Sequence, residues 1–243
     1  MALETTPAYR EQLHKEASEY GIGLTDEQIS KLLKHLDLVL EKNKVMNLTR
    51  VTNPEQAIRL HILDSLLLTK VPIPFEGAFL DIGTGPGFPG VPFGIVTGLS
   101  GDILDSTAKK INADNEMIAS LDLKQPIVGQ AARVEEYALE HSRAYDIIMA
   151  RAVAKAQIIL EYAAPLQKMG GCLIIAKARI QEDELKAAAK AARMCGYELV
   201  SCETFELPNE SGHREILIYR KVAKESIKLP RANGVAKQHP LGE

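Results

Sequence analysis

The chain has 243 residues, of which 46% are apolar and 25% charged, and its formal net charge is −3 at pH 7. This length suits one large domain or one domain with an extension, and the apolar content argues against global disorder. The charge excludes a strongly basic nucleic-acid binder but allows a local basic patch, and the 5% of aromatic residues argue against a broad base-stacking platform.

Residues 8–70 are predicted to be helical. Thr25 suits an N-cap, and Gln28 follows three residues later as in a capping box. Apolar residues then recur at helical spacing up to Leu40. A second helix is expected over 53–68, with Pro54 in its first turn. We therefore expect residues 1–76 to form a helical extension.

Short apolar runs alternate with helical stretches beyond residue 77. The predicted strands cover 78–82, 101–104, 126–129, 145–149, 171–176, 197–205 and 214–219, and the predicted helices cover 88–97, 107–121, 133–140, 155–167 and 181–194. This alternation indicates parallel βαβ units and a doubly wound sheet over residues 77–220. The last two strands leave no room for a helix, so one of them is expected to run antiparallel to its neighbour. Residues 221–243 form a basic tail that we expect to pack on or near this domain.

The stretch "LDIGTGPGFPG" joins the first predicted strand to the next helix and is rich in glycine. Gly83, Gly85 and Gly87 allow a tight turn and let a ligand approach the backbone, although they could serve the turn alone. Asp81 precedes the loop, where it favours a cationic ligand over a diphosphate. Asp105 ends the second strand, at the place that binds ribose hydroxyls. These features predict S-adenosylmethionine, with NAD as the alternative.

Two further strand ends carry candidate ligand contacts. Glu135, with the backbone at Val134, follows the third strand and could accept a hydrogen bond from an adenine amino group. Its alternative role is that of a solvated carboxylate at a helix start. Arg151 ends the fourth strand and could bind a carboxylate or phosphate, or form a surface ion pair.

The residues that several other reactions require are not found in this sequence. No Asn/Asp-Pro-Pro-aromatic loop follows the fourth strand, and Cys172, Cys195 and Cys202 suit the core better than a nucleophile. The six histidines lack metal-ligand spacing, so no metal is expected. An acceptor that needs no deprotonation, such as guanine N7, fits this pattern. The odd cysteine count, the polar start and the lack of a long apolar run predict a cytoplasmic protein without a membrane span, and we expect a monomer.

Seven segments occur in this order along the chain: "KNKVMNLTRV", "HILDSL", "LDIGTGPGFPG", "LDSTAKK", "RVEEYA", "ARAVA" and "KLPRANGVAKQHPL". Through them the chain resembles the glucose-inhibited division protein B family, also called ribosomal RNA small subunit methyltransferase G. The resemblance covers roughly residues 30–240. It implies a Rossmann-like class I fold with a seven-stranded, mostly parallel sheet. It also implies S-adenosylmethionine-dependent N7 methylation of a guanine in the 530 loop of 16S rRNA, on the 30S subunit or an assembly intermediate, with S-adenosylhomocysteine as the product.

The resemblance also carries site residues over to this chain. The implied cofactor positions are Gly83, Phe88, Ser106, Thr107, Ala108, Val134, Glu135 and Arg151, in addition to the positions argued above. The RNA-facing or acceptor-positioning candidates are Asn47, Arg50, His61, Asp64, Ser65, Arg151 and Lys177, and the tail adds Lys228 and Arg231. The chain departs from the family pattern at Leu60, Ala150 and Ala178. A nicotinamide-dependent or small-molecule enzyme and a non-catalytic RNA-binding scaffold remain as alternatives.

Overall fold

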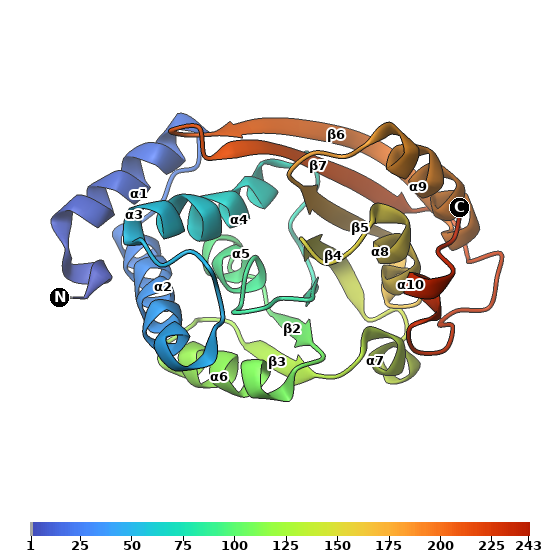
Figure 1. Ribbon diagram of the computed structural model, residues 1–243, viewed down its shortest axis with the longest axis horizontal. Coiled ribbons are helices and arrows are strands. Elements are labelled where there is room, and N and C mark those ends of the chain that lie inside the picture. Colours follow the sequence, from blue (N-terminus) through green and yellow to red (C-terminus); the bar gives the residue numbers. More distant parts are fainter. Residues whose placement is uncertain (1) are drawn as a thin grey trace.

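The computed structural model describes residues 2–243 and places one seven-stranded sheet between two helical layers (Figure 1). The strands lie in the order β3-β2-β1-β4-β5-β7-β6. Their bounds are Phe79–Ile82 (β1), Gly101–Asp105 (β2), Ile127–Ala131 (β3), Tyr145–Arg151 (β4), Gln167–Lys177 (β5), Tyr197–Leu207 (β6) and Gly212–Lys221 (β7). The predicted fold class, a mostly parallel seven-stranded α/β sheet, is confirmed.

Strand direction decides which residues meet at one edge of the sheet. β1 to β5 pair in parallel, so their carboxyl ends share an edge. β7 runs antiparallel to both β5 and β6, as expected of one of the last two strands. Because Glu215 of β7 pairs with Lys177 of β5, the beginning of β7 lies at this same edge.

Alternating strand residues supply the two faces of the sheet, as the pleat requires. Phe79 points into a core shared with the N-terminal helices, α5 (Gly90–Thr97) and α6 (Ala108–Ala119). Leu80 points into a second core, which α7, α8, α9 and α10 cover. Their bounds are Val134–Glu140 (α7), Ala156–Ala163 (α8), Glu182–Cys195 (α9) and Val235–Gln238 (α10). The helical layers therefore leave the strand edge at the carboxyl ends available for a ligand.

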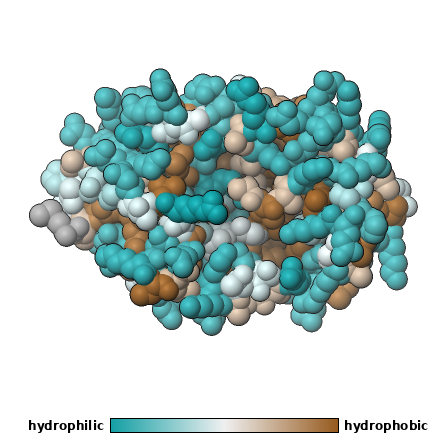
Figure 2. Space-filling view, in the orientation of Figure 1, coloured by the Kyte–Doolittle hydropathy of each residue, from teal (hydrophilic) through white to brown (hydrophobic). Residues whose placement is uncertain are grey.

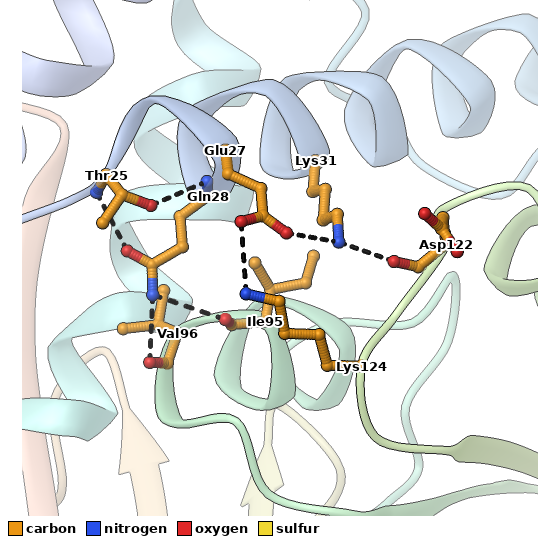
Figure 3. Close-up of polar contacts among 8 residues, drawn as sticks. All are labelled: Thr25, Glu27, Gln28, Lys31, Ile95, Val96, Asp122 and Lys124. Carbon is orange, nitrogen blue, oxygen red and sulfur yellow. Dashed lines mark hydrogen bonds and ion pairs between the residues drawn. The ribbon is translucent and has the colours of Figure 1, made fainter.

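The N-terminal segment is helical throughout most of its length. It contains η1 (Leu3–Thr5), α1 (Pro7–Glu19), α2 (Asp26–Met46), α3 (Pro54–Ala57), the π-helical η2 (Ile58–Leu63), α4 (Asp64–Leu66) and η3 (Leu67–Lys70). The capping box is confirmed, because Gln28 N donates to Thr25 Oγ1 and Thr25 N donates to Gln28 Oε1. Gln28 Nε2 also donates to the carbonyl oxygen of Val96, so the start of α2 is tied to the end of α5 (Figure 3).

Two predicted helices have different bounds in the structure. The helix expected over 53–68 is interrupted by the π-helical η2, a feature that apolar periodicity does not reveal. The helix expected over 155–167 ends at Ala163, and Gln167 already belongs to β5. Pro165 explains this error, because proline has no backbone N–H with which to continue the hydrogen bonds of the helix.

The surface seen in Figure 2 is covered mainly by hydrophilic side chains, and apolar residues show between them in smaller patches. Among the described residues, the most exposed large apolar side chains are Val45 and Leu139, which lie far apart in the sequence. No helix in residues 2–243 has both the length and the apolar content needed to cross a membrane.

Candidate functional site

The glycines of the loop between β1 and α5 are needed for different structural reasons. Gly83, Gly85 and Gly87 have φ angles of +73°, +62° and +83°, where residues with a Cβ are strained. A Cβ on Gly83 would lie 2.6 Å from a methyl group of Val153, so this glycine is also needed for packing. A Cβ on Gly85 would meet nothing within 4 Å. The loop therefore serves its own turn and presents open space at Gly85.

Asp81 lies beneath this loop and is fully buried. Its Oδ2 accepts a hydrogen bond of 2.8 Å from Gly90 N at the start of α5, and its Oδ1 has no partner. Burial raises the pKa of this carboxyl group to about 6. Asp81 has no exposed surface and does not line the crevice, so its predicted contact with the cofactor stays a prediction.

A crevice opens beside the loop at the carboxyl ends of β1, β2 and β3. Five predicted cofactor residues line it, namely Gly83, Asp105, Ser106, Val134 and Glu135. The rest of the lining consists of Ile82, Leu104, Ala132, Arg133, Val153, Tyr162 and Lys237. The fold thus brings together residues from three strand ends, as a doubly wound sheet requires.

Asp105 is held in place by the turn that follows β2. Its Oδ1 accepts a hydrogen bond of 2.8 Å from Thr107 N, and its Oδ2 lies 3.8 Å from Lys110 Nζ. Helix α6 begins directly afterwards at Ala108. Because one oxygen is fixed by the backbone, the other is available for a hydroxyl group in the crevice.

A second pocket lies next to the crevice, at the ends of β4 and β5. It is lined by Leu60, His61, Asp64, Arg151, Ala152, Ala176, Lys177, Ala178, Arg179 and Arg214. Asp64 is the centre of its charge network and its side chain is only 7% exposed. Arg151 Nη1 donates to Asp64 Oδ2 at 2.9 Å, and Arg214 Nε donates to Asp64 Oδ1 at 2.7 Å. Arg151 therefore belongs to a largely buried bridge rather than to an exposed surface pair.

Phe88 connects the loop to the N-terminal helices through two imidazole rings. His61 stacks on Phe88 with ring centroids 4.9 Å apart, and His35 packs against Phe88 at 4.7 Å. His61 Nε2 is also hydrogen-bonded to Thr49 Oγ1 at 2.8 Å. Burial, aided by the charge of Arg151, lowers the pKa of His61 to about 4. Burial lowers the pKa of His35 to about 3, so both rings are neutral at pH 7.

Other predicted site residues have internal partners. Ser65 is fully buried, and its hydroxyl donates to the backbone oxygen of His61. Lys177 Nζ donates to the backbone oxygen of Ala154 and lies 2.6 Å from Glu184 Oε1. Ser65 is thus placed to support the π-helical turn rather than to contact a ligand.

The remaining RNA candidates lie outside these two pockets. Asn47 ends α2 with a left-handed backbone, and Arg50 follows in the same loop. Both line a shallow surface groove together with Leu40, Asn43, Lys44, Leu48, Thr49 and Thr52. Lys228 is exposed, whereas Arg231 is bound by the carboxylate of Glu161. RNA contacts by these residues stay predictions.

The residues around the site that the sequence analysis missed include two imidazole or guanidinium side chains and two residues of the crevice. His35 is hidden within the apolar face of α2, and Arg214 enters the second pocket from β7. Tyr162 and Lys237 complete the crevice from α8 and α10. Only His35 had a local signal, since it is a polar residue at helical spacing from Leu32 and Leu36. No cluster of three or more metal-ligating side chains is found in the part of the chain that the structure describes.

The family described as rRNA small subunit methyltransferase G (GidB) matches residues 28–216. The chain belongs to this family. Its relatives include the ribosomal RNA small subunit methyltransferase G of Acetivibrio thermocellus, which is 37% identical with 96% of each chain covered. The corresponding protein of Nostoc punctiforme is 36% identical, with 89% of this chain and 92% of the relative covered.

Solved structures agree on the fold at low sequence identity. A SAM-dependent methyltransferase from Methanosarcina mazei gives a TM-score of 0.52 at 15% identity and covers 65% of this chain and 98% of its own. The [4+2]-cyclase SpnF gives a TM-score of 0.55 at 13% identity and covers 81% of this chain and 94% of its own. Since proteins with different reactions share the fold, the activity of this rRNA methyltransferase family member has to be argued from its site.

Proposed function

We propose that the chain transfers a methyl group from S-adenosylmethionine to N7 of a guanine in the 530 loop of 16S rRNA, on the 30S subunit or an assembly intermediate. The observation that supports this most is a crevice beside the glycine loop next to a cationic pocket, both at one edge of the sheet. Membership of the family supports the choice of rRNA as the substrate.

The crevice suits the adenosine part of the cofactor. Asp105 offers a carboxylate oxygen to the ribose hydroxyls, and Glu135 offers one to the adenine amino group. The open side of Gly85 leaves the backbone accessible to the methionine part. When bound, S-adenosylmethionine supplies an electrophilic methyl group on its sulfonium.

The second pocket suits a guanine that needs no deprotonation. Both oxygens of Asp64 accept from arginines, and His61 Nε2 is bonded to Thr49, so neither side chain is placed as a free base. Guanine N7 needs none, because its lone pair would form the new N–CH3 bond while the S–CH3 bond breaks to leave S-adenosylhomocysteine, and no proton has to leave.

Arginine usually binds guanine through both O6 and N7, which would occupy the lone pair that must react. The Asp64 carboxylate holds Arg151 and Arg214 in fixed directions, and this arrangement lets their remaining N–H groups bind O6 or a phosphate while N7 stays free. The pocket therefore acts by orientation, a contribution that can supply several kcal/mol of rate enhancement.

The decisive experiment is transfer of labelled methyl groups to 30S subunits from cells that lack the matching activity, followed by mapping of the modified nucleotide. Label at N7 of a single guanine in the 530 loop supports the proposal. Label elsewhere refutes the proposed target, and binding of RNA without any transfer favours a non-catalytic scaffold. Thermal unfolding separates the nicotinamide alternative, because S-adenosylhomocysteine should raise the midpoint and NAD should not.

A further inference from the structure

We propose that the C-terminal segment 231–238 is a wall of the cofactor crevice, which positions Glu135 and thereby sets the affinity for the cofactor. The inference rests on the proposed function of that crevice. It also gives Arg231, which the sequence suggested as an RNA contact, a different role. Arg231 would hold the segment that positions Glu135, and would act on cofactor binding in this indirect way.

Arg231 anchors this segment to α8. Its Nε donates to Glu161 Oε1 at 2.6 Å, and its Nη2 donates to Glu161 Oε2 at 2.5 Å. The same Nη2 donates to the backbone oxygen of His239 at 2.9 Å. The side chain of Glu161 is 3% exposed, so this two-pronged pair is shielded from water on the carboxylate side. A guanidinium used in this way has little capacity left for a phosphate.

The anchored segment then contacts the first turn of α7. Gly234, with a φ of +81°, donates its backbone N–H to Glu135 Oε1 at 3.0 Å. Asn233 Nδ2 donates to Glu136 Oε1 at 2.5 Å. Glu135 is 7% exposed, and Oε2 is the oxygen not taken by Gly234. The segment thus fixes the direction of the Glu135 carboxylate.

The segment also forms part of the crevice surface itself. Lys237 of α10 lines the crevice together with Tyr162 of α8. Burial, together with the nearby charge of Glu135, raises the pKa of Tyr162 to about 12, so this side chain remains a neutral hydroxyl. A cofactor in the crevice is therefore enclosed by Lys237, which follows the last strand in the chain, as well as by the strand ends.

Lys228 offers a matched comparison three residues earlier. It is exposed, and none of the hydrogen bonds or ion pairs found within residues 2–243 involves its side chain. If charge alone mattered in the tail, Lys228 and Arg231 would behave alike. If Arg231 acts as an anchor, their effects on the two ligands separate.

The test uses the full chain with the substitutions Arg231→Gln, Arg231→Lys and Lys228→Gln. Calorimetry measures the affinity for S-adenosylhomocysteine, and filter binding measures the affinity for a 530-loop RNA at several salt concentrations. We expect both Arg231 variants to lose about tenfold in S-adenosylhomocysteine affinity, equivalent to about 1.4 kcal/mol, with RNA affinity little changed. Lysine keeps the charge but loses the two-pronged geometry, so its failure to rescue identifies the anchor. Lys228→Gln should show the reverse pattern.

Unchanged S-adenosylhomocysteine affinity in a folded Arg231 variant overturns the inference. If both Arg231 variants fail to fold, Lys237→Ala decides, because an exposed crevice residue can be removed without loss of the core. Loss of affinity in Lys237→Ala supports the wall, and wild-type affinity overturns it. A wild-type chain that binds no S-adenosylhomocysteine overturns the proposed function and this inference together, whereas binding that all variants retain overturns the inference alone.

Discussion

The substitution Asp64→Asn removes the charge that joins Arg151 to Arg214. Asp64 accepts one hydrogen bond from each guanidinium, at 2.9 and 2.7 Å, and its side chain is only 7% exposed. Asparagine keeps one acceptor oxygen and turns an amide N–H toward the other arginine. A hydrogen bond to a charged group contributes about 1.5–3 kcal/mol, and breaking a buried ion pair costs about 3–5 kcal/mol. We therefore expect a loss of about 2–4 kcal/mol in the free energy of unfolding.

Urea-induced unfolding measures this loss, with Glu41→Gln as the control. Glu41 pairs with Lys44 at 2.7 Å, but their side chains are 61% and 67% exposed, so this pair should contribute no more than about 1 kcal/mol. Methyl transfer by folded Asp64→Asn should also fall, because both arginines lose their fixed direction. If Asp64→Asn is as stable as the control variant and fully active, the role assigned to the bridge is wrong.

Five further substitutions test other parts of the protein. Asp105→Ala should weaken S-adenosylhomocysteine binding by about 1–3 kcal/mol, and unchanged binding in calorimetry would remove Asp105 from the cofactor site. Gly85→Ala should cost about 1–2 kcal/mol of stability from backbone strain, and its effect on cofactor affinity should be larger. Gly90→Ala serves as the comparison, because its Cβ would lie 2.5 Å from a core methyl group. This variant should mainly lower the stability measured in urea titrations. Asp114 is buried without hydrogen-bond partners and burial raises its pKa to about 8, so the folded state keeps a proton that the unfolded state releases above about pH 4. Wild-type stability therefore falls as pH rises from about 4 to 8, and the advantage of Asp114→Asn should grow over that range; a constant difference between the two proteins contradicts this assignment. Lys228→Ala should lower the slope of RNA affinity against salt by about 1, and an equal slope would show that Lys228 contacts no phosphate.

The parts of the fold that were predictable depend on local pattern. Short apolar runs bounded by glycine or proline located all seven strands, and strand-end position alone brought Gly83, Asp105 and Glu135 to one crevice. This works because the carboxyl ends of parallel strands share an edge whatever the rest of the chain does. The helix predicted over 155–167 was extended too far because Pro165 was overlooked, although the sequence contains this signal.

The parts that were missed depend on contacts between distant residues. Arg214 reaches Asp64 only because β7 is antiparallel, and neither the order of strands nor their register follows from hydropathy. The pairing of Arg231 with Glu161 was also not foreseen, because the basic charge of the tail does not reveal a buried carboxylate on α8. Glu161 lies in the apolar run "QIILEYAA", and nothing in this run indicates which residue its carboxylate pairs with.

The bridge at Asp64 also has a consequence for the order in which the protein is made. Arg214 follows Asp64 by 150 residues in the chain, and at synthesis rates of about 5–20 residues per second this separation lasts about 8–30 s. During that time a nascent chain can form the glycine loop and the first strands, but its acceptor pocket lacks one of the two guanidiniums that hold Asp64. Pairing of β7 with β5 is thus the step that completes this pocket, and a chain released before that strand would lack both Arg214 and the proposed crevice wall at residues 231–238.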